Sequence, residues 1–323
     1  MSKSETERED ERDGEAEPSE SPAKAIRSKA TATSKKAAVE KQKPADPKTE
    51  PEARRSPVRE LVIGALVLVG IRAALTLLNV VLPTAPLAEV VIGALVVDVV
   101  AGRAGLEWTR PDETVGPQLR RAGFGALGAA LALGVAVALS AALGWARVSN
   151  GHADGMVLLA LVGGGAAAVR DELLLRGVPL MFAARVNIPK PAAIGFAALL
   201  SPAFALADAS PSAGSLALSI ASGLFFASLY AYAGGAPAAI GAHAAWLFGV
   251  GPLLRGVLET AWLTGELGDG RAAGGAPAFV ASAAFVLLAL AVPRIAASAK
   301  LGDAADARPS RKAPPERAPS SGA

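Results

Sequence analysis

Residues 157–177 read VLLALVGGGAAAVRDELLLRG, an uncharged run that ends in four ionisable groups within seven positions: Arg170, Asp171, Glu172 and Arg176. A charge at membrane depth is costly, so such groups usually face a protein interior or a watery cavity and often serve a pathway or a reaction. On a helix, Glu172 and Arg176 are four residues apart with the acid first, which is the favourable order for an ion pair. The other interpretation is a helix that has just left the membrane and ends in solvated charges.

The composition of the whole chain supports a membrane location for this stretch. The 323 residues are 52% hydrophobic and 19% charged, with a mean hydropathy of +0.39. This profile predicts an all-α, polytopic membrane helix bundle, and the region 61–296 has room for about eight helices of spanning length. We expect the spans at about 61–82, 87–101, 122–146, 156–180, 192–209, 213–233, 237–254 and 276–296.

The Lys and Arg residues of the loops predict the orientation. They gather before the first predicted span, between the second and third, between the fourth and fifth, and after the eighth, whereas the loops 83–86 and 210–212 carry none. Short loops that are rich in Lys and Arg stay in the cytoplasm. Eight spans therefore predict a multi-pass protein of the cell inner (plasma) membrane with both termini in the cytoplasm, whereas seven or nine would break the pattern.

The two ends of the chain differ from its middle. Residues 1–57 and 299–323 hold few large apolar side chains and cannot bury enough surface to offset chain entropy. We expect two disordered tails around a membrane bundle at 58–298. The first tail turns from acidic to basic as it approaches the first span. This polarity favours contact with the lipid bilayer over nucleic acid as a partner. No short cleavable signal peptide is expected before the first apolar run.

Several kinds of site are excluded by residue counts. The chain has no cysteine, so disulfides, thiolate ligands and a cysteine nucleophile are absent. It has only His152 and His243, so a site of three histidines is impossible. The run at 163–168 is all Gly and Ala and lacks the Gly-Lys of a phosphate loop, so we interpret it as a surface for close helix packing.

Polar groups that could meet lie in three parts of the apolar region. The first is the cluster of Asp171, Glu172 and Arg176. The second is Asp208, four residues after Phe204 and beside a Ser-Pro-Ser turn, where it could also be a turn residue. The third is His243, the one histidine inside a predicted span, for which a hydrogen-bonded structural role is the alternative.

The order of these motifs resembles the CAAX protease and bacteriocin-processing (CPBP, or Abi) family of intramembrane endopeptidases, over about residues 155–295. That family has Glu-Glu-x-x-x-Arg, Phe-x-x-x-His and His-x-x-x-Asn on successive helices. The corresponding stretches are Asp171-Glu172-Leu173-Leu174-Leu175-Arg176-Gly177, Phe204-Ala205-Leu206-Ala207-Asp208 and His243-Ala244-Ala245-Trp246-Leu247. The stretch GGAPAAI at 234–240 is also similar to the family.

Two positions depart from the family pattern in chemical character. Asp208 stands where the family has histidine, and Leu247 stands where it has asparagine. The resemblance implies that a glutamate activates water and that histidine and asparagine hold the water and the oxyanion. An oxyanion needs hydrogen-bond donors, but an ionised aspartate only accepts and leucine does neither.

The resemblance implies an endopeptidase that cuts a membrane-associated protein or peptide. Glu172 would be the base, Arg176 would position it, His243 would be the acid or oxyanion donor, and Asp171 and Asp208 would support them. No particular cofactor is implied, but Asp171, Glu172, Asp208 and His243 could hold a divalent cation. A catalytically inactive scaffold with the same fold is the alternative function. Asp171 and Asp208 could also share a proton, but on straight spans, at about 1.5 Å per residue, they would lie far apart.

Overall fold

The computed structural model describes residues 56–108, 113–208, 211–267 and 274–299, and almost all of them are helical. The predicted tails, 1–57 and 299–323, fall almost wholly outside the described residues. The helices are α1 (Pro57–Val81), α2 (Pro86–Arg103), α3 (Val115–Ala142), α4 (Met156–Glu172), α5 (Val178–Arg185), α6 (Lys190–Asp208), α7 (Ala213–Tyr232), α8 (Ala236–Phe248) and α9 (Gly275–Ser298).

Two π-helical turns extend these helices. The turn η1 (Leu173–Gly177) joins α4 to α5 in one helical path, and η2 (Gly249–Val257) continues α8. Between α5 and α6 only residues 186–189 are non-helical. A second irregularity of the backbone is η1, directly after Glu172. Single π-helical turns are rare and are often found at functional sites.

The predicted all-α membrane bundle is confirmed. Each of the eight expected spans corresponds to one helical path. In the described part of the chain five of these paths are long and apolar enough to cross a membrane: α1, α3, α7, α8 with η2, and α9. The others are less apolar: α2 carries three charged residues, the path of α4, η1 and α5 carries five, and the apolar part of α6 covers only 190–204. Large apolar side chains such as Leu66, Leu127 and Leu287 point outward on the long helices, as a lipid-facing surface requires. The chain is a membrane protein.

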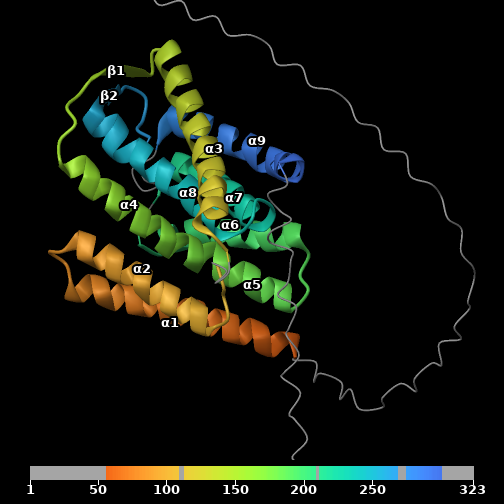
Figure 1. The fold of residues 1–323 in the computed structure, drawn as a ribbon. Coiled ribbons are helices and arrows are strands. Elements are labelled where there is room, and N and C mark those ends of the chain that lie inside the picture. The colour runs from red at the N-terminus through yellow and green to blue at the C-terminus, as the bar shows by residue number, and fades with distance from the viewer. Residues whose placement is uncertain (1–55, 109–112, 209–210, 268–273, 300–323) are drawn as a thin grey trace, which may run out of the picture. The chain divides into compact units, whose positions relative to one another are not determined.

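In the described part of the chain, small residues set the most extensive helix contact, between α3 and α8, which cross in Figure 1. A Cβ added at Gly125 would collide with the backbone carbonyl of Ala238, and one added at Gly241 would collide with that of Ala122. Each helix thus presents a glycine to the backbone of the other. Close backbone approach through small residues is a common way for helices to pack in lipid. This contact fixes the position of α8, which carries His243.

One small element was not predicted. The strands β1 (Ala146–Asn150) and β2 (Leu258–Trp262) pair in antiparallel fashion, with Val148 opposite Thr260. They explain why α3 ends at Ala142, four residues before the predicted limit: the chain turns at Gly144, whose φ is +71°, and enters β1. The ladder ties the end of α3 to the end of η2.

Candidate active site at the meeting point of α4, α6, α7 and α8

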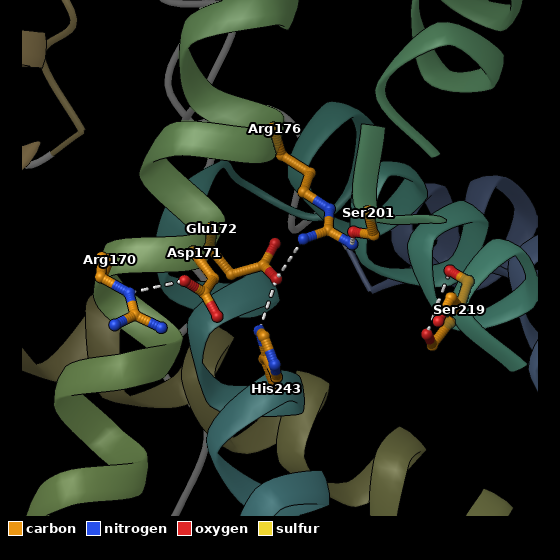
Figure 2. Close-up of polar contacts among 8 residues, drawn as sticks. Arg170, Asp171, Glu172, Arg176, Ser201, Ser219 and His243 are labelled. Carbon is orange, nitrogen blue, oxygen red and sulfur yellow. Dashed lines mark hydrogen bonds and ion pairs between the residues drawn. The ribbon is translucent and has the colours of Figure 1, made fainter. Parts of the chain in front are cut away.

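The carboxylate of Glu172 is the centre of a buried polar cluster. Its side chain has no exposed surface. His243 Nδ1 lies 2.8 Å from Glu172 Oε1, and Arg176 Nη1 donates to the same oxygen at 3.1 Å. Figure 2 shows this carboxylate between the two side chains. The structure therefore brings together three of the five site residues that the sequence predicts.

Arg176 connects Glu172 to a third helix. Its side chain is 2% exposed, and Nη2 donates to Ser201 Oγ of α6 at 2.9 Å. The planar fork of a guanidinium can make two such directed contacts at once. The ion pair that the four-residue spacing predicts forms although the π-helical turn η1 lies between Glu172 and the end of Arg176's turn, because both side chains face the bundle interior.

Phe226 of α7 lies under both partners of Glu172. The ring of His243 stacks on it with centroids 5.0 Å apart and an interplanar angle of 19°. The guanidinium carbon of Arg176 lies 5.6 Å from the same ring centroid. One aromatic ring thus supports the imidazole and the guanidinium, which restricts the orientation of each.

The contact with Glu172 decides which nitrogen of His243 can act as a base. An ionised carboxylate only accepts hydrogen bonds, so Nδ1 carries the proton that points to Glu172. The lone pair of the neutral ring then lies on Nε2. A carboxylate that fixes the tautomer of a histidine in this way is the arrangement found in catalytic triads.

A cavity of about 680 Å³ lies against this cluster. His243, Asp171, Arg176 and Ser201 line it, whereas Glu172 lies behind the wall that they form. Asp171 is 28% exposed, and Arg170 Nε donates to its Oδ1 at 2.7 Å. Arg170 also lies 3.8 Å from Glu89 of α2. Of the two adjacent acids, Asp171 is therefore the one that reaches water in the cavity.

Two predicted features lie partly outside what the structure describes. Asp208 is the last residue of α6, but its side chain is outside the described residues, and with it any dyad with Asp171. Among the described side chains, no group of three or more His, Asp or Glu converges as metal ligands would. Glu172 Oε1, which could have been a metal ligand, instead contacts Arg176 Nη1 and His243 Nδ1.

The serines of the cavity wall were not predicted from the sequence. Ser201, Ser219 and Ser222 line the cavity beside Leu247, which offers no polar group. Ser201 lies three residues before Phe204 of the second motif, so on a helix the two share a face. That spacing could have indicated that Ser201 faces the site. Glu172 Oε2 and Arg176 Nε are buried without a hydrogen-bond partner among the described residues. Buried groups of this kind are uncommon and often mark function.

One of the comparisons with known proteins gives a match. No curated protein and no solved structure gives a significant match to the chain. A family model described as type II CAAX prenyl endopeptidase Rce1-like does match, over residues 152–249. This segment contains α4, η1 and α5 to α8, and hence Glu172, Arg176, Ser201 and His243. The match confirms the family resemblance that the three motifs predict: residues 152–249 are similar to the Rce1-like CAAX endopeptidases.

Proposed function

We propose that the protein is an intramembrane endopeptidase that hydrolyses a peptide bond of a membrane-associated protein or peptide. The observation that carries the proposal is the buried contact of Glu172 with His243 at the wall of a 680 Å³ cavity. The match of residues 152–249 to a CAAX endopeptidase family supports the reaction class. A half-buried, oriented histidine beside a cavity also has the arrangement that general base catalysis needs.

The burial of Glu172 changes the roles that the resemblance implies. A base must reach the water that it activates, and Glu172 has no exposed surface. We therefore assign the proton transfer to His243, with Glu172 holding its tautomer and stabilising the imidazolium that forms. Asp171 is paired with Arg170, which weakens it as a base, but it lines the cavity and can accept a hydrogen bond from the same water.

The hydrolysis then proceeds in two steps. The oxygen of water attacks the carbonyl carbon of the scissile bond, and one proton of the water passes to His243 Nε2. Negative charge develops on the former carbonyl oxygen. The carbon–nitrogen bond then breaks, His243 returns its proton to the leaving nitrogen, and the products are a new carboxyl terminus and a new amino terminus. Arg176 positions Glu172 throughout.

The placement in the cell follows from the charge pattern. The Lys and Arg residues of the loops support an inner-membrane location of the bundle at 58–298 with both termini in the cytoplasm. The partners would be the lipid bilayer and the peptide that enters the cavity.

Unbiased profiling of peptide termini in host membranes tests the proposal. Membranes with wild-type protein are compared with membranes that contain Glu172→Gln at matched abundance. The exposed Glu259 of β2 supplies the control, because Glu259→Gln is the same change away from the cavity. In a catalytic triad, replacing the carboxylate that fixes the histidine tautomer lowers kcat by about 10⁴-fold. We expect termini that are present with wild type and Glu259→Gln and absent with Glu172→Gln.

The alternative is a binding scaffold, which the departures at Asp208 and Leu247 favour. A scaffold would give identical termini for all three proteins while each remains folded and abundant. That outcome would rule out the endopeptidase. The search would then turn to proteins that cross-link to the cavity.

A further inference from the structure

We infer that Ser201 is a catalytic residue, whose hydroxyl donates a hydrogen bond to the carbonyl oxygen of the scissile bond as that oxygen becomes negative. The inference rests on the proposed endopeptidase function and adds a residue to it. The family pattern implies histidine and asparagine for this role, and this chain has Asp208 and Leu247 instead. The described part of the cavity wall must supply the donor from another position.

The contact with Arg176 leaves the proton of Ser201 available. Arg176 Nη2 donates to Ser201 Oγ at 2.9 Å, so the serine oxygen acts there as an acceptor. A hydroxyl has one proton and two lone pairs. When a cation occupies one lone pair, the O–H is polarised and becomes a stronger donor. Ser201 lines the cavity, so this donor lies on the surface that a substrate would meet.

Two other hydroxyls of the same wall, those of Thr76 and Ser222, are engaged with their own helices. Thr76 Oγ1 donates to the carbonyl of Arg72 at 3.0 Å, and Ser222 Oγ donates to the carbonyl of Ser219 at 3.4 Å. Leu247 contributes no polar atom. Among these hydroxyl groups, Ser201 is the one that a charged side chain holds in place.

The position of Ser201 relative to His243 also suits the role. Both residues connect to Glu172 Oε1, His243 directly and Ser201 through Arg176. Phe226 supports both the imidazole and the guanidinium. A pre-organised donor of this kind needs no reorganisation when charge develops, which is why such groups contribute strongly to catalysis.

Steady-state hydrolysis of the membrane peptide that gives the strongest Glu172-dependent terminus, synthesised with a fluorophore and a quencher, tests this inference. We expect Ser201→Ala to lower kcat by about 10²–10³-fold with little change in KM, because the bond forms only in the transition state. Ser201→Thr keeps a hydroxyl and should recover most of the activity. Ser282→Ala is the matched control, because the hydroxyl of Ser282 donates to its own helix, α9, and does not line the cavity; this variant should behave as wild type.

Each result is decisive. Full activity of Ser201→Ala, with Glu172→Gln inactive, would overturn the role of Ser201 and leave the endopeptidase intact. Equal losses in Ser201→Ala and Ser201→Thr, with lowered thermal stability, would show a packing role and also overturn it. If wild type produces no cleaved peptide, the proposed function fails and the role of Ser201 fails with it.

Discussion

Arg176 is the residue whose chemistry is least replaceable, since one guanidinium bridges Glu172 and Ser201. We expect Arg176→Lys to lower hydrolysis by about 10-fold or more although the charge is kept, because an ammonium lacks the planar fork that makes both contacts. Removing the charge should cost more. A buried ion pair that loses one partner destabilises by about 3–5 kcal/mol, so Arg176→Leu should also lower the unfolding midpoint.

The measurement is hydrolysis of the profiled peptide together with thermal unfolding in detergent. Lys190→Arg at the start of α6 is the control. It exchanges one basic side chain for the other away from Glu172 and should leave the activity unchanged. An Arg176→Lys protein with wild-type activity would show that the bridge to Ser201 has no catalytic importance.

The sequence predicted this residue cluster only in part. Spacing on a helix and the family motif were enough to predict the Glu172–Arg176 pair and to connect it with His243. They could not predict that Asp171 faces the cavity while Glu172 lies behind its wall. That difference depends on how α4 is rotated about its own axis and on the π-helical turn η1 that follows it. Ser201 was missed because its partner lies 25 positions away in the chain.

At the scale of the elements, the contact between α3 and α8 controls where His243 lies. We expect Gly241→Ala to destabilise the protein by about 1–3 kcal/mol, because the added Cβ collides with the backbone of Ala122, which cannot rotate away. The separation of the two helices should also displace His243, two residues further along α8. Activity should therefore fall at temperatures where the protein is still folded.

Gly134→Ala is the matched control, since Gly134 also lies on α3 but a Cβ there meets nothing within 4 Å. Exchange of an exposed helical glycine for alanine is neutral or stabilising. Thermal unfolding and hydrolysis of the two variants, measured side by side, compare them. Equal stability of the two proteins would contradict the packing role of Gly241.

The elements themselves were largely predictable. Apolar runs of spanning length predicted the helical paths, because a chain in lipid must satisfy its backbone hydrogen bonds within each segment. The limits were less accurate: α3 begins at Val115, seven residues before the predicted start, because a helix can continue through a polar stretch that contains Arg120 and Arg121. The strand pair was missed because short strands in loops leave no periodic pattern.

At the scale of the whole molecule, the eight crossings that we propose would place alternate loops on opposite sides of the membrane, and the absence of cysteine makes this directly testable. Thr84 and Thr114 are both exposed and lie in the loops after α1 and α2. We expect Thr84→Cys to react with a membrane-impermeant maleimide in intact spheroplasts and Thr114→Cys to react only after permeabilisation. The physical reason is that arginines at 103, 110, 120 and 121 lie on both sides of Thr114, whereas residues 83–86 around Thr84 contain no Lys or Arg.

Because the wild-type chain has no cysteine, each variant can be labelled only at its introduced cysteine, and the wild-type protein is the unlabelled control. The opposite labelling pattern would place the termini outside the cytoplasm. Labelling of both loops from the same side would mean that α2, the helix with three charged residues, does not cross the membrane. The side chain of Glu89 on α2 contacts Arg170 at the cavity, so in that case the cavity would open to water beside α2 and would not be enclosed by spanning helices. The labelling therefore also decides whether a substrate reaches Asp171 and His243 through lipid or directly from water.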